Sequence, residues 1–213
     1  MSLVIHAFPQ SPRNFKVLAV ANHLGLDYRY HQIDLLKGAQ KSPEFMALNP
    51  NGRAPVIEDD GFVLWESNAI LQYLATKKPQ AGLMPMHEKG RADVTRWLFW
   101  DSCHWDPACI PFIFENILKA LRGMGAPDAA KLGEAEPKFA QAAAILEAQL
   151  ASQKFVCGDS LTLADFALAA PLNLTGEAKY PLGPYAAIKR WYGEVSSLPA
   201  WRRTSADHLA VAA

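Results

Sequence analysis

Two adjacent polar residues, Glu66 and Ser67, stand where the sequence predicts the start of a helix. The free N–H groups and the positive dipole end of a helix N-terminus favour an anion. A ligand with both a carboxylate and an ammonium group fits this pair. Its carboxylate can accept from the Ser67 N–H and hydroxyl, and its ammonium can donate to Glu66. The alternative is structural, because serine is a common N-cap in any protein.

Ser11 is the residue best placed for chemistry. It directly precedes a predicted helix that begins at Pro12, so its hydroxyl and nearby N–H groups point into one small volume. A thiolate in that volume gains from the helix dipole and from an O–H···S⁻ hydrogen bond, and both lower the pKa of a thiol. The protein would then ionise the sulfur of a bound molecule without supplying a nucleophile of its own. The structural alternative is again a capping serine.

Short elements of alternating type must position these residues. The predicted order is strand 3–8, helix from 12, strand 28–35, polar loop 37–41, short helix from 42, strand 55–58, strand 62–65 and helix from 67. Gly25 ends the first long helix, and Asp59-Asp60-Gly61 turns the hairpin. This β-α-β-α-β-β-α order is typical of the thioredoxin-like layout, in which helices flank a mixed sheet.

Pro55 stands where the third strand should begin, and a proline cannot donate to a strand ladder. It suits a sheet edge, or a cis peptide bond that turns the backbone outward to meet a ligand. The preceding Pro50-Asn51-Gly52 predicts a tight turn.

The second half of the chain is predicted to be helical. We expect an α/β domain followed by an all-α domain, with bounds 1–78 for the first, 79–88 for a Pro- and Gly-containing linker and 89–213 for the second. Helical periodicity runs from 88 to 121, and Pro107 and Pro111 must kink or split that helix. Thr162 and Asp165 form a capping box at the start of a later helix.

Bulk properties exclude several classes of function. Of the 213 residues, 21 are Lys or Arg and 21 are Asp or Glu, so the zero net charge argues against a nucleic-acid partner. Three cysteines without CxxC spacing favour neither a disulfide framework nor a metal site, and they fit a reducing compartment. The segment Met1–His6 lacks the features of a signal peptide, and no apolar run could span a bilayer. We expect a soluble cytoplasmic protein.

The chain resembles the glutathione S-transferase family over nearly its whole length, and most strongly in two stretches. The first is Asn49-Pro50-Asn51-Gly52-Arg53-Ala54-Pro55 with a hairpin and then Glu66-Ser67-Asn68-Ala69-Ile70-Leu71-Gln72-Tyr73-Leu74, and the second is residues 156–166. The resemblance implies that Pro55 is cis and that Ala54 pairs with the cysteinyl backbone of glutathione like an added strand. It also implies that Glu66 and Ser67 hold the γ-glutamyl end and that Ser11 is catalytic.

Further site residues follow from the same resemblance. Gln40 and Lys41 lie in the loop that reaches the glycine carboxylate of glutathione, and Arg53 replaces a common Gln and can also reach a carboxylate. The expected lining of the apolar substrate pocket is Phe8, Pro12, Trp105 and Phe112. Asp101 is a further candidate for contact with the glutathione amine.

The implied activity is attack of the glutathione thiolate on an electrophilic, mostly apolar small molecule, as in detoxification, by a homodimer. One alternative is a non-catalytic binding or regulatory protein of the same fold. A second is a thiol-dependent reductase that relies on Cys103 or Cys109, although Ser11-Pro12 replaces the Cys-Pro of such relatives. A third is a glutathione-dependent peroxidase, dehalogenase or isomerase.

Overall fold

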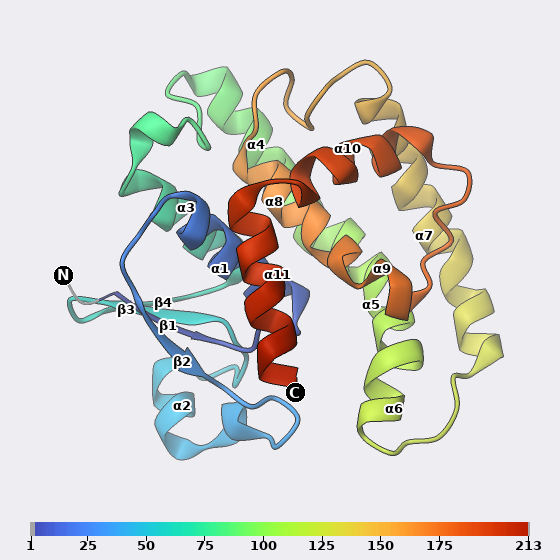
Figure 1. Ribbon diagram of the computed structural model, residues 1–213, viewed down its shortest axis with the longest axis horizontal. Coiled ribbons are helices and arrows are strands. Elements are labelled where there is room, and N and C mark those ends of the chain that lie inside the picture. Colours follow the sequence, from blue (N-terminus) through green and yellow to red (C-terminus); the bar gives the residue numbers. More distant parts are fainter. Residues whose placement is uncertain (1–2, 213) are drawn as a thin grey trace. The chain divides into compact units, whose positions relative to one another are not determined.

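The computed structural model describes residues 3–212, with side chains described for residues 3–205 (Figure 1). The chain forms two compact units. Unit 1 contains the residues up to Ala81 together with those from Ser197 onward, and unit 2 contains Gly82–Ser196. Among the described residues, no helix is both long and apolar enough to cross a lipid bilayer.

Unit 1 has the predicted thioredoxin-like element order. Its elements are β1 (Val4–Ala7), α1 (Pro12–His23), β2 (Arg29–Gln32), the 3₁₀ turn η1 (Ala39–Lys41), α2 (Pro43–Leu48), β3 (Val56–Asp59), β4 (Phe62–Trp65), α3 (Ser67–Thr76), the 3₁₀ turn η2 (Pro79–Ala81) and α11 (Pro199–Ala212). The strand order in the sheet is β2-β1-β3-β4. β1 is parallel to β2 and antiparallel to β3, and β3 is antiparallel to β4.

The two faces of this sheet are covered by different helices. Figure 1 shows α1 and α3 on one side and α2 on the other. Ile5 and Ile57 are completely buried, and α3 contacts both β3 and β4. On the face that Val56 occupies, Phe45 of α2 and Ile33 complete a second hydrophobic cluster. Alternation along β3 therefore divides its side chains between two cores.

Local sequence signals fix both ends of α1. Pro12 occupies its first turn, where the missing N–H costs no hydrogen bond. At the other end Gly25 adopts a φ of +61°, its N–H bonds the Asn22 carbonyl, and the Leu26 N–H bonds the Ala21 carbonyl. This pair of bonds is a Schellman motif, and it confirms that Gly25 ends the helix.

The end of the chain differs from the predicted division. The second domain was expected to extend over 89–213, but the segment from Ser197 onward belongs to unit 1. There α11 packs on α1, with the Trp201 ring 4.8 Å from that of Phe15 and Asn22 Nδ2 donating to Thr204 Oγ1 at 2.8 Å. Helical periodicity predicts such a helix but not the unit on which it packs. Residues 1, 2 and 213, at the outer ends of the predicted domains, lie outside the described residues.

Unit 2 is helical throughout its named elements. These are α4 (Glu88–Trp100), the π turn η3 (Asp101–Trp105), α5 (Asp106–Ile113), the π turn η4 (Phe114–Leu118), α6 (Lys119–Leu121), α7 (Ala129–Leu150), α8 (Leu163–Ala169), the 3₁₀ turn η5 (Ala170–Leu174), α9 (Thr175–Ala178) and α10 (Ala186–Ser196). Pro107 and Pro111 were predicted to kink or split the long helix, and the structure shows no split, since helical elements run without a gap from α4 to α6. A proline cannot donate the usual α-helical bond, and the wider turn, in which Asp106 N–H bonds the Asp101 carbonyl, keeps the helix continuous.

Asp165 organises the interior of unit 2. Its Oδ2 accepts from the Thr162 N–H at 2.8 Å, which confirms the capping box. Its Oδ1 accepts from the Val156 N–H at 2.9 Å and from Trp191 Nε1 at 2.8 Å. Burial raises the pKa of this carboxyl, while these hydrogen bonds to the ionised form oppose the rise.

A buried ion pair closes the far end of the sheet in unit 1. Asp59, at the end of β3, pairs with Lys77 just after α3, and Tyr73 Oη donates to Asp59 Oδ2 at 2.6 Å. The Asp59 side chain is only 4% exposed. The bonds from Lys77 and then from Tyr73 hold the pKa of Asp59 below its usual value.

We predict that Asp59→Asn lowers the free energy of unfolding by about 2 kcal/mol near neutral pH, because it removes a charged hydrogen-bond acceptor from a buried site. The folded-state pKa is lowered, so the contribution is complete above the unfolded pKa of about 4 and disappears as pH falls through the folded value. Urea denaturation over a pH series measures this. The control is Asp93→Asn in the exposed Asp93–Arg96 pair, which should change stability by less than about 0.5 kcal/mol. A pH-independent difference for Asp59→Asn would contradict this account.

Candidate active site

The strand register brings the candidate residues of unit 1 to one end of the sheet. Val56 pairs with Trp65 and with His6, so Ala54, Glu66 and Phe8 each lie just beyond the same end of β3, β4 and β1. Gln32 pairs with Ala7 in the parallel direction, so the segment that leads from β2 toward Gln40 leaves the sheet at this end too. Segments distant in sequence therefore meet beside the N-terminus of α1.

Ser11 occupies the N-cap position of α1 without capping it. Its backbone is extended, with φ −89° and ψ 126°, and its carbonyl accepts from the Asn14 and Phe15 N–H groups at 3.0 and 2.8 Å. Its side chain makes no capping hydrogen bond. The hydroxyl is therefore free to donate to a ligand at the positive end of a 12-residue helix.

Ala54 and Pro55 lie across from this turn. The Ala54–Pro55 peptide bond is cis, which selects one of the two conformations that the sequence left open. Asn14 connects the two segments, since its Oδ1 accepts from the Phe8 N–H at 3.0 Å and its Nδ2 donates to the Ala54 carbonyl at 3.2 Å. The backbone of the Ser11 turn and that of Ala54 are therefore joined through one side chain.

Glu66 and Ser67 form the start of α3, but in a different arrangement from the expected one. Ser67 was predicted to be the N-cap, whereas the N-cap is Glu66 and Ser67 is the first helical residue. Glu66 has a φ of +71°, a backbone conformation that is rare for a residue other than glycine. Glu66 is exposed and its side chain makes no capping bond, while Ser67 is 9% exposed. A carboxylate and free helix N–H groups are thus presented side by side.

Gln40 and Lys41 lie against the turn that precedes Ala54. Gly52 has a φ of +58°, and a Cβ there would lie 2.7 Å from Lys41 Nζ and 3.0 Å from the Gln40 carbonyl oxygen. Asn49 closes this turn by donating to the Arg53 carbonyl at 2.6 Å. The Lys41 ammonium thus lies beside the residue that precedes Arg53, and both cations are exposed. Gln40 Oε1 is buried without a hydrogen-bond partner among the described residues.

The four predicted lining residues of an apolar pocket fall into two groups. Phe8 and Pro12 flank the Ser11 turn and are largely buried. Trp105 and Phe112 lie in the core of unit 2, where they are 0% and 3% exposed. Trp105 Nε1 donates to the Leu168 carbonyl at 2.8 Å, and the Phe112 ring packs 5.4 Å from that of Phe139. This burial contradicts the prediction that these two rings contact a substrate, because helical periodicity is the same for a core residue and a pocket wall.

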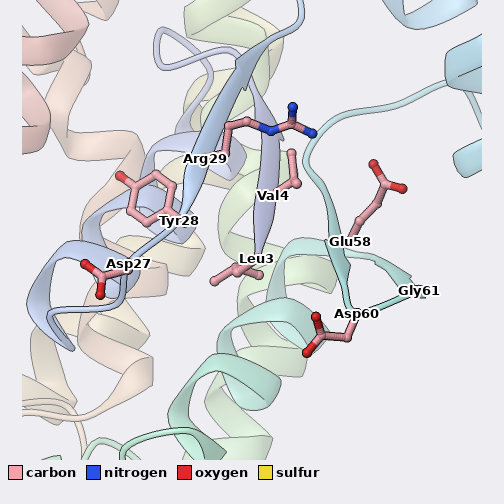
Figure 2. A pocket seen from close by; sticks show the side chains of 8 residues that line it. All are labelled: Leu3, Val4, Asp27, Tyr28, Arg29, Glu58, Asp60 and Gly61. Atoms are coloured by element: carbon pink, nitrogen blue, oxygen red, sulfur yellow. The ribbon is translucent and has the colours of Figure 1, made fainter. Parts of the chain in front are cut away.

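A cavity of about 520 Å³ lies at the opposite end of the sheet in unit 1 (Figure 2). Its lining is Leu3, Val4, Asp27, Tyr28, Arg29, Glu58, Asp60 and Gly61. Val4 pairs with both Arg29 and Glu58, so a cation and an anion flank it on neighbouring strands. Glu58 Oε1 lies 2.7 Å from His6 Nε2. The predicted site residues do not line this cavity.

Asn14 joins the candidate site through its hydrogen bonds to Phe8 and Ala54, although it is not among the candidate residues predicted from the sequence. It is completely buried on α1, and it precedes the apolar Val17 and Leu18 by one helical turn. An amide on the apolar face of a helix must find hydrogen-bond partners inside the protein. That position is the sequence signal that could have identified it.

Known protein families match segments in both units of the chain. Residues 1–76 match the model of the glutathione S-transferase N-terminal domain, and residues 104–199 match that of the glutathione S-transferase C-terminal domain. The chain is 36% identical over 209 residues to glutathione S-transferase 3 of Zea mays, an alignment that covers 96% of this chain and 93% of that protein.

Solved structures agree over almost the whole length. Glutathione transferase F7 from Populus trichocarpa is 30% identical, with a TM-score of 0.88 and coverage of 97% of this chain and 99% of that one. Glutathione S-transferase-I bound with lactoylglutathione is 26% identical, with a TM-score of 0.86 and coverage of 96% and 98%. The chain therefore belongs to the glutathione S-transferase family.

Proposed function

We propose that this glutathione transferase conjugates the thiolate of glutathione to an electrophilic, mostly apolar small molecule, with Ser11 as the catalytic residue. The observation that carries the proposal is the Ser11 hydroxyl, which stands at the N-terminus of α1 and does not cap it. A serine that only stabilised the helix would use its oxygen to accept an N–H bond. Here the Ser11 O–H is available to donate to a sulfur.

Glutathione lies along the end of the sheet in this proposal. Its cysteinyl backbone pairs with Ala54 ahead of Pro55, and its γ-glutamyl carboxylate and ammonium bind Ser67 and Glu66. Lys41 and Arg53 bind the glycine carboxylate through charge-assisted hydrogen bonds, and the Gln40 amide can donate a further hydrogen bond to it. The support is the register that brings these segments to the same end of β1, β3 and β4.

The chemical step needs no protein nucleophile. Ser11 donates an O–H···S⁻ hydrogen bond, and the dipole of α1 favours the negative charge, so the bound thiol ionises at a lower pH than free glutathione. The thiolate then attacks an electrophilic carbon of the second substrate and forms a C–S bond. The bonding electrons leave with a leaving group or move onto an adjacent electron-withdrawing group.

Two of the three cysteines, Cys109 and Cys157, favour this mechanism over thiol-disulfide chemistry. Cys109 is completely buried, and burial raises the pKa of its thiol well above the ordinary value. Burial also raises the pKa of Cys157 to about 12. A reactive cysteine needs a lowered pKa and an accessible sulfur. All three cysteines are free thiols, which supports the proposal that the protein works in the reducing cytoplasm.

We predict that Ser11→Ala raises the thiol pKa of bound glutathione by about 1–2 units, the worth of one hydrogen bond to a charged group. The rate constant kcat for conjugation should fall about 10²-fold or more, with a smaller change in glutathione affinity. Ultraviolet absorbance of the thiolate across pH and steady-state kinetics measure these quantities. Unchanged thiol ionisation in Ser11→Ala would remove Ser11 from the mechanism.

The stability of the same variant separates the catalytic reading from the structural one. Because its side chain does not cap α1, Ser11→Ala should change the free energy of unfolding by less than about 0.5 kcal/mol. The matched control is Ser42→Ala, since Ser42 Oγ accepts from the Phe45 N–H at 3.2 Å and caps α2. Ser42→Ala should lower the free energy of unfolding by about 1 kcal/mol, because it removes this capping hydrogen bond. Equal losses in urea denaturation would mean that Ser11 is an ordinary cap.

We further propose that the protein is a homodimer that uses a groove on unit 2. This groove of about 420 Å³ lies between the η3–α5 segment and α7, and its lining is Trp100, Cys103, His104, Pro107, Ala108, Lys138, Gln141, Ala142 and Ile145. Ile145 is 47% exposed there. An exposed branched apolar side chain beside aromatic and polar groups suits a contact with a second copy.

Ile145→Arg should therefore shift the protein toward the monomer, measured by sedimentation equilibrium over a range of concentrations. The control is Leu121→Arg, because Leu121 is 57% exposed and does not line the groove. It should leave the association constant unchanged. A wild-type protein that sediments as a monomer, or an Ile145→Arg protein as dimeric as the control, would refute this interface.

A further inference from the structure

Asn14 combines three hydrogen bonds in one fully buried residue. Its backbone N–H donates to the Ser11 carbonyl at 3.0 Å, its Oδ1 accepts from the Phe8 N–H at 3.0 Å, and its Nδ2 donates to the Ala54 carbonyl at 3.2 Å. The partners fix the orientation of the amide, because Phe8 N–H can only donate and the Ala54 carbonyl can only accept. Each end of the side chain therefore holds a different segment.

The bonds of Asn14 continue into the Ser11 turn. The Ser11 N–H donates to the Phe8 carbonyl at 2.9 Å, so both backbone groups of Phe8 are fixed, one by Asn14 and one by Ser11. The ladder between β1 and β3 ends at the pair His6 and Val56. Beyond that pair, the Asn14 side chain joins the β1 end to the β3 end.

We propose that Asn14 is a positioning residue that holds the Ser11 hydroxyl in fixed register with the Ala54 backbone, and so with the sulfur of glutathione. This inference rests on the proposed function and names a residue that acts through Ser11 and Ala54 without touching the substrate. A carbonyl oxygen has two lone pairs, so the Asn14 bond leaves one at Ala54 for the cysteinyl N–H of glutathione. The sulfur belongs to the side chain of that cysteinyl residue, which Ala54 positions. Because Asn14 bonds both Ala54 and the Ser11 turn, it sets the distance between the glutathione sulfur and the Ser11 hydroxyl.

The expected effect is large because thiolate stabilisation depends steeply on geometry. A displacement of about 1 Å between reacting groups can cost about 10²-fold in rate. Replacement of Asn14 frees the Ser11 turn from Ala54, and both glutathione binding and thiol ionisation should respond. A buried asparagine with a merely structural role would lower stability without changing the ionisation of a bound thiol.

The test compares Asn14→Ala with Asn22→Ala. Asn22 lies on the same helix, and its amide also makes two side-chain hydrogen bonds, to Thr204 and Tyr28, on the far side from Ser11. Thermal unfolding reports the stability of both variants. Thiolate absorbance of bound glutathione and kcat/KM report the site. Asn14→Ala should lower kcat/KM about 10- to 100-fold and raise the thiol pKa, and Asn22→Ala should change neither beyond about twofold.

The double variant Ser11→Ala/Asn14→Ala gives the sharper readout. If Asn14 acts through Ser11, replacing it should not raise the thiol pKa further once the Ser11 hydroxyl is absent. If Asn14→Ala does not fold, Asn14→Asp replaces it, because aspartate keeps the acceptor for Phe8 N–H and loses the donor to Ala54. The direct effect of its added negative charge on the thiol pKa would persist in Ser11→Ala/Asn14→Asp, whereas an effect that acts through Ser11 would not. A folded Asn14 variant with wild-type thiol pKa and kcat/KM overturns the inference, as does an equal effect of Asn22→Ala. Wild-type protein that fails to bind glutathione would instead contradict the proposed function.

Discussion

The pairing of β3 with β1 on one side and with β4 on the other is the constraint on which the site depends. It places Val56 opposite both His6 and Trp65, so the chain leaves the sheet at Phe8, enters it at Ala54 and leaves it again at Glu66, all at one end. A slip of one residue in either register would turn every following side chain to the other face. Ile5 and Ile57, completely buried on one face, make such a slip costly. The hydrophobic core thus fixes the positions of the polar groups.

The proposed activation relies on position rather than on a titrating protein group. A neutral hydroxyl and the end of a helix stabilise negative charge without themselves taking up or losing a proton. Such groups act only if they are held where the charge develops, because a hydrogen bond weakens steeply with misalignment. For this reason the hydrogen bonds donated by the side-chain amides of Asn14 and Asn49 are important. The Asn14 side chain joins the Ser11 turn to Ala54, and the Asn49 side chain closes the turn that precedes Ala54.

Much of unit 1 could be predicted because its signals are local. Pro12 and Gly25 mark the ends of α1, and Asp59-Asp60-Gly61 turns the hairpin between β3 and β4, with Asp60 and Gly61 at positive φ. These features depend on a few neighbouring residues and so can be recognised in a sequence. The candidate residues Ser11, Glu66 and Ser67 could be listed for the same reason, since each adjoins a predicted helix start.

Features that depend on distant contacts could not be predicted in the same way. The sequence gives no indication that α11 packs on α1, because its apolar face would suit either unit. Nor does periodicity distinguish Trp105 in a core from Trp105 in a pocket wall, and here the indole N–H bonds the Leu168 carbonyl. The φ of +71° at Glu66 is imposed by the junction between β4 and α3, although glutamate has no preference for it. The partners of Asn14 likewise exist only once the sheet has formed.

The most direct test of the whole account is a crystal structure of the wild-type protein with glutathione. We expect the glutathione sulfur within hydrogen-bond distance of Ser11 Oγ, the cysteinyl backbone paired with Ala54, and the γ-glutamyl group at Glu66 and Ser67. The Asn14 bonds to Phe8 and Ala54 should be unchanged. Glutathione whose sulfur points away from Ser11, or that binds in the cavity between Arg29 and Glu58, would contradict the account.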